Sequence, residues 1–387
     1  RITNNVLKTK NSLIQSDMNR LEELEKRCAE ILNSDISQME KAYWLTEYRK
    51  RYGSLPFAGL ARAAFIAVEL LDSLVASNLL EFKDIENFKK SITTISKKLT
   101  IDRKSLDRNE FIKKYGHLRP GTYDIRSIRY DKDPSYYFND NIENFDFVEN
   151  ENDSHKIAFQ IDLSKLQNID KILKKEGIKC TSVELLSFMK TTIEGREEAK
   201  FIFTKYLSEC IECIAAIGED HGFSRDDMSY CNYSDLKNYF VEGRDFKKGL
   251  EESINKGRSF YQETLKTTLP ALIRSEKDAW FFKEDDVQEN YVTSMSFTGK
   301  IESNLSSDLS GKAVVITSAD PGYDWIFSTN IGALITVWGG VNSHMAIRCE
   351  ELGVPAIIGV GESKYKKIIQ SRTIDIDCQS KIYKIHD

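Results

Sequence analysis

The chain lacks three features that would each point to a particular class of protein. It has no uninterrupted hydrophobic run, because the most apolar stretch, 57–77, carries Arg62, Glu69 and Asp72 and predicts an amphipathic helix. Basic residues are not in excess, since 55 Lys and Arg are interspersed with 60 Asp and Glu. No secretory signal is visible, because residues 1–32 are polar with a helical pattern. We therefore expect no membrane span and no nucleic-acid partner.

Closely spaced cysteines are also scarce. The seven cysteines form an odd, scattered set, in which Cys210 and Cys213 make one C-x-x-C pair. A structural zinc site needs four ligands, and no second Cys pair or His pair lies nearby, so we predict no metal site. Reduced thiols and the missing signal sequence together favour a cytoplasmic location.

The first three quarters of the chain have the apolar spacing of helices. Apolar side chains recur every three or four residues, which predicts helices over 13–32, 39–48, 60–75, 82–99, 163–175, 183–192, 196–217 and 234–269. Gly243, Gly249 and Gly257 are expected to interrupt the last of them. Residues 116–160 break the period with Pro, Gly and an aromatic-acidic run, which indicates a long irregular insertion. The prediction is a mainly α-helical domain over residues 1–282.

The pattern changes near residue 290. Short β-branched runs bounded by Gly, Asp or Ser predict strands over 292–297, 313–317, 333–337, 355–360 and 381–385. One compact helix is expected at about 343–352, which completes a small α/β (β/β/α) domain over 292–387. The polar, acidic segment 283–291 is the predicted hinge linker, so the fold class is multidomain.

The loop and helix around His344 form the most informative stretch. The preceding strand ends at Gly339 and Gly340, where glycine permits close backbone approach. Ser343 is a candidate N-cap, which puts His344 in the first turn of the next helix. Backbone N–H groups and the helix dipole favour an anion there, and a phosphoryl group on His344 would lie among them. The pattern by itself also fits a tight turn followed by an ordinary surface histidine.

A longer string of motifs resembles the swivelling phosphohistidine domain of phosphoenolpyruvate synthases, pyruvate phosphate dikinases and rifampicin-type antibiotic phosphotransferases. The motifs are Asp320-Pro-Gly-Tyr, Gly332-Ala-Leu-Ile-Thr, Gly339-Gly-Val-Asn-Ser-His-Met-Ala-Ile-Arg and Gly353-Val-Pro-Ala-Ile-Ile-Gly-Val-Gly. The resemblance covers about residues 292–387 and implies that His344 takes up and hands on a phosphoryl group. It implies five residues around the phosphate: Thr336, Gly339, Gly340, Ser343 and Arg348. Ser343 as a mere N-cap and Arg348 as a solvated helix residue stay open.

Three earlier patches resemble the substrate domain of the same enzymes. Tyr115-Gly-His-Leu-Arg-Pro-Gly-Thr-Tyr-Asp is similar to a Gly-His-Arg-x-Pro-Gly-Glu motif, although Leu118 precedes Arg119 and Thr122 stands in the place of Glu. Arg196-Glu-Glu-Ala-Lys and the stretch from Tyr52 to Arg62 are the other two. The resemblance implies six substrate-binding residues: His117, Arg119, Arg196, Glu197, Lys200 and Arg62. Their plain alternatives are an exposed turn, a solvated helix start and an amphipathic helix.

The domain order narrows the resemblance. A phosphoenolpyruvate synthase carries a barrel of ~250 residues after its His domain, whereas about 40 residues follow His344 here. A terminal His domain after a helical domain resembles the rifampicin-type enzymes, in which an ATP-grasp domain comes first. No Gly-rich phosphate loop is visible before residue 290 and the chain begins at Arg1. We therefore expect that ATP and Mg²⁺ are bound by a missing N-terminal ATP-grasp domain of the same polypeptide, and that this chain alone binds no cofactor and is inactive.

The His loop and the 114–124 stretch look most like those of bacterial L-glutamine kinases, which start capsule phosphoramidate synthesis. This likeness implies a dikinase-type transferase that phosphorylates the side-chain amide of L-glutamine while ATP is converted to AMP and phosphate. No residue in the chain dictates glutamine. An antibiotic or pyruvate phosphotransferase of the same architecture, or a non-catalytic phosphocarrier module, therefore stays open.

Overall fold

The computed structural model describes residues 7, 13–138, 161–242, 245–267, 269, 273–280, 288–341 and 343–386. The chain divides into two compact units: unit 1 comprises residues 1–115 and 146–222, and unit 2 comprises residues 116–145 and 223–387. The sequence-based prediction assigns residues 116–145 and 223–282 to the helical domain, whereas the described residues of these two stretches group with the C-terminal sheet. The predicted domain bounds of 1–282 and 292–387 stay a prediction.

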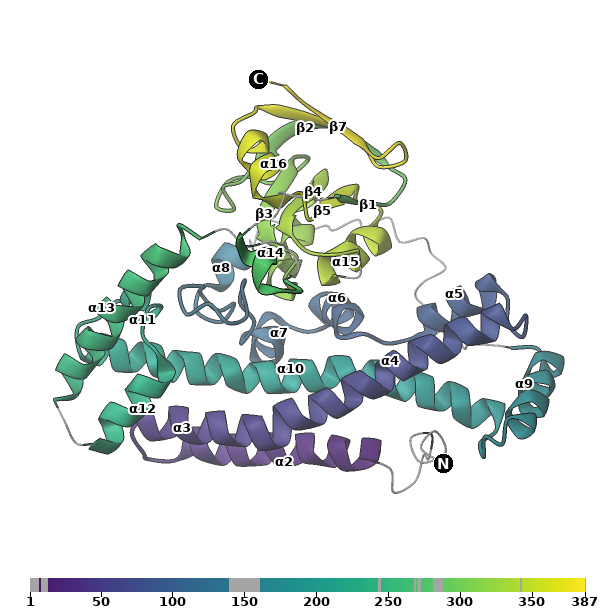
Figure 1. The fold of residues 1–387 in the computed structure, drawn as a ribbon, viewed down its shortest axis with the longest axis horizontal. Helices are drawn as coiled ribbons and strands as arrows, with labels where there is room; N and C mark the ends of the chain where they lie inside the picture. Colours follow the sequence, from purple (N-terminus) through teal and green to yellow (C-terminus); the bar gives the residue numbers. More distant parts are fainter. Residues whose placement is uncertain are drawn as a thin grey trace. The chain divides into compact units, whose positions relative to one another are not determined.

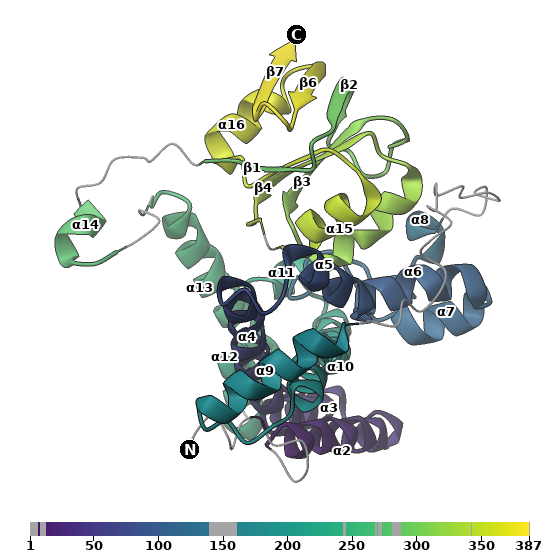
Figure 2. The same cartoon turned by 90° about the vertical axis from the view of Figure 1, so that its right-hand side faces the viewer.

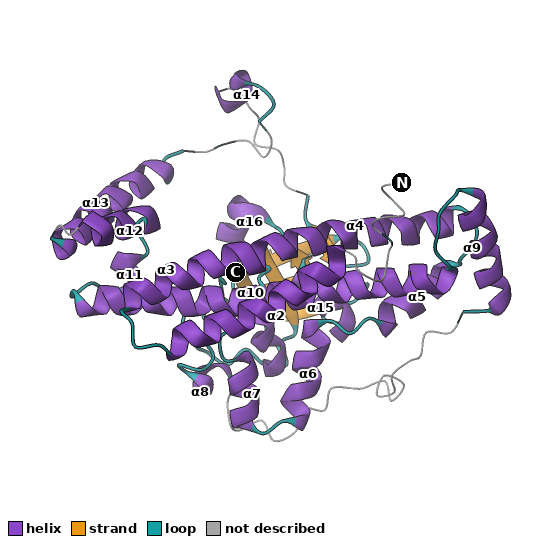
Figure 3. Cartoon of the chain, turned by 90° about the horizontal axis from the view of Figure 1, so that it is seen from below, coloured by secondary structure: helices purple, strands orange, loops and turns teal. Residues whose placement is uncertain are grey.

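Unit 1 is a helical bundle built along one long helix, α10 (Ser182–Asp220). Helices α2 (Leu13–Asn33), α3 (Gln38–Tyr48) and α4 (Leu55–Ala76) pack along α10, as Figures 1 and 3 show. A π-helical segment, η1 (Arg49–Ser54), joins α3 to α4. The shorter helices of this unit are α5 (Phe82–Ser91), α6 (Ile95–Ser105), α7 (Arg108–Tyr115) and α9 (Leu163–Lys175). The helical periodicity of this region is thereby confirmed.

Two helix predictions in unit 1 are wrong in detail. The stretch 82–99 is not one helix, because Ile92 is extended and the side chain of Thr94 caps a new helix by accepting a hydrogen bond from Lys97 N. The predicted helices over 183–192 and 196–217 are parts of the single helix α10, which continues through Gly195 between them. The side of the helix that carries Gly195 is buried. A helix interior tolerates one glycine at a modest cost, which tertiary packing offsets.

Helix α4 is the most apolar helix of unit 1. By length and composition alone, the stretch Gln38–Ala76 would suffice to cross a membrane, and a third of its most apolar window is buried in the structure. Leu60, Ala67 and Leu71 are buried, whereas Phe65 is exposed. The absence of a membrane span stays a prediction.

Unit 2 begins with the irregular segment 116–138, which ends in the short helix α8 (Pro134–Tyr137). The rest of the predicted irregular insertion, residues 139–160, lies outside the part of the chain that the structure describes. The helices that follow are α11 (Arg225–Met228), α12 (Tyr233–Glu242), α13 (Phe246–Thr264) and α14 (Glu276–Trp280).

The prediction that Gly249 and Gly257 interrupt a helix is wrong, because α13 runs through both; Gly243 lies outside the described residues. A Cβ at Gly249 would lie 2.6 Å from the ring of Tyr239, and one at Gly257 would overlap the carbonyl of Tyr230. These glycines therefore serve close packing of α13 rather than helix ends.

The C-terminal part of unit 2 is a seven-stranded mixed sheet in the order β1-β5-β4-β3-β2-β6-β7. Figure 2 shows this sheet with β6 and β7 side by side at one end. The strands are β1 (Asn290–Val292), β2 (Ser296–Glu302), β3 (Ala313–Ser318), β4 (Ala333–Trp338), β5 (Ala356–Ile358), β6 (Thr373–Asp377) and β7 (Ile382–His386). Strands β2, β3, β4 and β5 are parallel to their neighbours within that set, and the outer pairings are antiparallel. The small α/β unit is therefore confirmed.

Three elements of the sheet region differ from the prediction. The run 292–297 is two strands, β1 and β2, separated at Thr293, whose φ of 73° ends the extended backbone. Strand β6 and helix α16 (Gly361–Ile368) are not predicted from the sequence. Residues 283–287 of the predicted linker 283–291 lie outside the described residues, and Asn290 and Tyr291, its last two residues, belong to β1.

Alternate residues of the central strands face the two sides of the sheet. Val314, Ile316 and Leu334 pack with Met345 of helix α15 (His344–Leu352). The intervening residues 313, 315, 333 and 335 pack with Val360 and with Ile368 of α16. Both faces are therefore covered, as parallel strands require, and the carboxyl end of β4 leads directly to His344.

Candidate functional site

The structure confirms that His344 opens a helix behind a glycine turn. The side chain of Ser343 caps α15 by accepting a hydrogen bond from Ala346 N at 3.3 Å. Gly339 has a φ of 145°, and a Cβ there would lie 2.8 Å from Ala319 Cβ. Gly340 is different, because no atom lies within 4 Å of the position its Cβ would take. Glycine is thus required at the first position of the turn, for conformation and for space.

His344 is held by a buried acid, Asp324, which the sequence analysis does not identify. Asp324 lies in a 3₁₀-helix, η2 (Pro321–Thr329), and its Oδ1 is 3.0 Å from Nε2 of His344. The His344 side chain is 20% exposed and that of Asp324 5%. The available signal was the position of Asp324 among Tyr323, Trp325 and Ile326, because an acid inside an apolar run needs a buried partner. The ring is thus reachable from solvent while its partner is not.

Arg348 lies one turn after His344 and binds the same acid. Its Nε is 3.0 Å from Asp324 Oδ1, and its Nη1 is 2.8 Å from Oε2 of Glu351. Arg348 is buried, so the alternative of a solvated helix residue is wrong. Its predicted contact with a phosphate stays a prediction.

The charge balance at Asp324 favours the carboxylate. Burial by itself would raise the pKa of Asp324, but the hydrogen bond from His344 and the charge of Arg348 outweigh burial and hold that pKa below its usual value. Burial by itself would lower the pKa of Arg348, but the negative charge of Asp324 raises that pKa above its usual value. Asp324 is therefore an anion that accepts hydrogen bonds.

This protonation state fixes the proton on the His344 ring. A carboxylate can only accept, so Nε2 of His344 carries the hydrogen that Asp324 binds. In the neutral ring Nδ1 is then the nitrogen without a proton. A nucleophilic step through Nδ1 would keep the bond to Asp324, whereas one through Nε2 would require that His344 first release it.

Thr336 has a structural contact that the prediction of a phosphate role does not include. It is fully buried in β4, and its Oγ1 accepts a hydrogen bond from Gly359 N at 3.1 Å. Its carbonyl also accepts from Gly359 N and Val360 N, each at 3.0 Å. Thr336 therefore ties the end of β5 to the strand that leads to His344.

The motif residues His117 and Arg119 lie in unit 2, as His344 does, and both are buried. Nη1 of Arg119 donates to the carbonyl of Ser127 at 3.2 Å. The alternative of an exposed turn is therefore wrong for these two side chains. Their predicted contact with a substrate is not tested by this geometry.

The other four predicted substrate residues lie on two neighbouring helices of unit 1. Arg196 and Glu197 on α10 form an ion pair at 2.7 Å, and Lys200 on α10 is exposed. Arg62 on α4 is exposed and its Nε donates to Ala58 O at 3.1 Å. The pairing with Glu197 engages Arg196, so the expectation that both cations of this helix turn cradle a phosphate stays a prediction.

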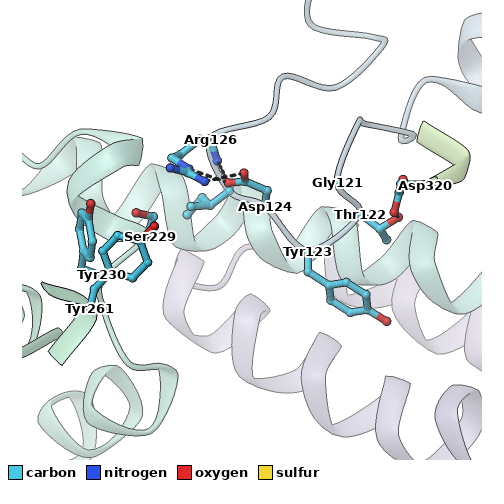
Figure 4. A pocket seen from close by; sticks show the side chains of 10 residues that line it. Gly121, Thr122, Tyr123, Asp124, Arg126, Ser229, Tyr230, Tyr261 and Asp320 are labelled. Atoms are coloured by element: carbon cyan, nitrogen blue, oxygen red, sulfur yellow. Dashed lines mark hydrogen bonds and ion pairs between the residues drawn. The ribbon is translucent and has the colours of Figure 1, made fainter. Parts of the chain in front are cut away.

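A pocket of about 450 Å³ lies within unit 2 beside the motif (Figure 4). It is lined by residues 121–126, Ser229, Tyr230, Tyr261 and Asp320. Asp124 binds Arg126 through both carboxylate oxygens, and Thr122 Oγ1 lies 3.4 Å from Asp320 Oδ2. Asp320 also accepts a hydrogen bond from Gly322 N and so caps the helix η2 that carries Asp324. Over the described ranges, no group of three or more His, Cys, Asp or Glu side chains is placed to hold a metal ion.

Comparison with known families places the histidine site within a matched segment. Residues 310–381 match the family model for the mobile domain of PEP-utilising enzymes. No curated protein matches the chain. The matched segment contains Asp324, His344 and Arg348, which the hydrogen bonds described above join. The match indicates phosphotransfer through a phosphohistidine.

Proposed function

Since residues 310–381 match the mobile domain of PEP-utilising enzymes, we propose that this chain relays a phosphoryl group through His344 to a small acceptor. The observation that carries the proposal is the His344–Asp324 pair at the start of α15. The ring is partly exposed, its orientation is fixed by a buried anion, and it lies where a helix dipole stabilises negative charge.

The transfer has two steps in which bonds and charges balance. A ring nitrogen of His344 attacks phosphorus, a P–N bond forms, and the P–O bond to the leaving group breaks with its electron pair on oxygen. The acceptor nucleophile then attacks the same phosphorus, the P–N bond breaks, and the electron pair returns to the ring. The acceptor loses one proton in this step. Asp324 keeps the ring oriented through both steps and stabilises positive charge on it.

The donor proposed for this relay is ATP with Mg²⁺, bound by an N-terminal ATP-grasp domain of the same cytoplasmic polypeptide. The acceptor proposed is the side-chain amide of L-glutamine. His344 would attack the β-phosphorus of ATP with AMP as the leaving group, and water would then cleave the terminal phosphate from the pyrophosphoryl group on the ring. Transfer of the remaining phosphoryl group to glutamine completes the balance, in which ATP, water and glutamine give AMP, phosphate and the phosphoramidate of glutamine. The likeness of the His loop and of the 114–124 stretch to those of L-glutamine kinases supports this choice of acceptor. His117, Arg119, Arg62, Arg196, Glu197 and Lys200 are the residues proposed to bind the acceptor.

The test uses the full-length polypeptide with Mg²⁺-ATP and, separately, L-glutamine, pyruvate and rifampicin. Phosphorus NMR of the products should show a phosphoramidate with glutamine, together with AMP and phosphate. The variant His344→Asn should abolish every phosphorylated product, whereas the control His221→Asn should leave turnover unchanged, because His221 lies in unit 1 and binds the carbonyl of Ile217.

Three other outcomes separate the alternatives. Phosphorylated pyruvate or drug would keep the relay and replace the acceptor. Phosphoprotein that forms at His344 without any acceptor product would favour a carrier module. Turnover by His344→Asn at the wild-type rate would overturn the relay itself.

A further inference from the structure

The helix η2, which carries Asp324, is held by the segment 116–138 rather than only by its own sheet. The hydroxyl of Tyr130 donates a hydrogen bond to the carbonyl of Gly322 at 2.8 Å. Tyr130 is 1% exposed, and its ring lies 4.6 Å from that of Tyr137, centroid to centroid. A buried tyrosine hydroxyl that donates a hydrogen bond to a backbone carbonyl fixes the position of that carbonyl.

The two backbones also touch at this place. A Cβ on Gly322 would overlap the carbonyl oxygen of Arg119 and lie 2.7 Å from Pro120 Cα. Arg119 belongs to the stretch that resembles a substrate motif. The main chain of that motif is therefore pressed directly against the first turn of η2.

The other side of Asp324 is held by aromatic contacts. Trp325 is buried, and its ring centroid lies 5.5 Å from that of Tyr137 and 5.7 Å from that of Tyr136. Tyr130 and Tyr137 share one hydrophobic core with Val314, Ile316 and other residues of the sheet and of α15. Gly322 and Trp325 flank Asp324 within about one turn of a 3₁₀-helix, so the segment 116–138 restrains Asp324 from both sides.

We propose that Tyr130 is a positioning residue of the phosphohistidine site, which acts by holding η2 so that Asp324 stays on Nε2 of His344. The segment 116–138 then helps to orient the His344 ring, and it belongs to unit 2, as His344 does. The effect of Tyr130 on phosphoryl transfer rests on the proposed function, whereas the effect of Tyr130 on the proton of the His344 ring does not. A merely structural role would lower stability and leave the ring unchanged.

The experiment compares Tyr130→Phe with a matched control, Tyr136→Phe. The control removes a hydroxyl from a partly exposed ring that contacts the same Trp325. Nitrogen NMR of protein labelled with ¹⁵N-histidine reports which ring nitrogen carries the proton, and His344→Asn assigns the signal among the five histidines. In Tyr130→Phe the ratio of Nε2–H to Nδ1–H tautomer should fall about fivefold, the equivalent of one net hydrogen bond. In Tyr136→Phe it should not change.

A second readout follows the chemical phosphorylation of His344 by phosphoramidate, without any acceptor. The initial rate should fall about fivefold in Tyr130→Phe and stay at the wild-type value in Tyr136→Phe. Gly322→Ala should reproduce both effects, because its Cβ would displace η2 from Arg119.

The outcomes are separable. A wild-type tautomer ratio in folded Tyr130→Phe and Gly322→Ala would overturn the positioning role. A shifted ratio in those variants, with no phosphorylation of His344 in the wild type, would leave the positioning role standing and count against the relay.

Discussion

His344 and Asp324 are joined by a bond of 3.0 Å between Nε2 and Oδ1, although they lie on different helices of unit 2. The same oxygen accepts from Nε of Arg348. One buried carboxylate oxygen therefore orients the His344 ring and also balances the charge of the buried Arg348. Removing the charge of Asp324 should affect both stability and chemistry.

Asp324→Asn should lower the free energy of unfolding at pH 7 by about 3 kcal/mol, because it leaves Arg348 without its buried anion. The pKa of Asp324 is lower in the folded protein than its ordinary value near 3.9. The contribution of the carboxylate is therefore complete above about pH 4 and is lost as the pH falls through the folded-state pKa. Urea unfolding at a series of pH values measures the difference.

The control for this prediction is Glu350→Gln, which removes an exposed carboxylate from the same helix as His344. It should change stability by less than about 0.5 kcal/mol at every pH. If the gap between wild type and Asp324→Asn were the same at pH 7 and pH 3, Asp324 would not be an anion in the folded protein.

Gly339→Ala and Gly340→Ala form a matched pair in the turn before His344. The first forces a side chain into a φ of 145° and to within 2.9 Å of Ile358 Cγ2, whereas the second meets no atom. We expect Gly339→Ala to cost about 1–3 kcal/mol or more and Gly340→Ala to be nearly neutral. Thermal unfolding of both variants checks this, and equal melting temperatures would refute the assigned geometry.

Ser343 tests the two roles that the sequence leaves open. Ser343→Ala should cost about 1 kcal/mol, because it removes the acceptor for Ala346 N, and Ser343→Asn should recover most of that loss. We expect Ser343→Asn also to recover phosphorylation of His344, measured with phosphoramidate, since capping is the role that the structure shows for this side chain. Recovery of stability without recovery of phosphorylation would show that the hydroxyl contacts the phosphoryl group.

Gly257→Ala should destabilise the protein even though alanine is the better helix former. In an exposed helix the change would gain about 1 kcal/mol. Here the new methyl group would overlap the carbonyl of Tyr230, and such overpacking costs about 1–3 kcal/mol. Urea unfolding should therefore show a loss for Gly257→Ala and little change for the neighbouring control Lys256→Ala, which lies on the exposed side of α13. A gain in stability for Gly257→Ala would show that α13 lies farther from Tyr230.

Local signals predict most of the fold and the position of His344 at the start of a helix. The glycine turn, the Ser343 cap and the start of α15 at His344 depend on neighbouring residues, and each is confirmed. Asp324 lies 20 residues from His344, and Tyr130 lies 192 residues from Gly322. Neither contact leaves a periodic trace, because η2 and the segment 116–138 are irregular.

At the glycines of α13 a local signal is present, but the prediction made from it is wrong. Gly249 and Gly257 carry the local signal of a helix break, yet α13 continues through them because Tyr239 and Tyr230 need the space. Tertiary packing here overrides a propensity of about 1 kcal/mol per glycine. A sequence shows that such a residue is unusual, but its neighbours in space decide what it does.

The hydrogen bonds from Gly359 N and Val360 N to Thr336, called the clamp below, hold β4 to the end of β5. They allow the turn before His344 to open locally while the sheet stays paired. The amide proton of Gly359 is bound by both oxygens of Thr336, and all of these atoms lie behind the turn. An opening that breaks the bond from Ser343 N to Gly340 O leaves the clamp intact. Amide exchange at Ser343 can therefore proceed by local fluctuation, while exchange at Gly359 requires strands β4 and β5 to part. The turn before His344 can therefore rearrange while strands β4 and β5 stay paired.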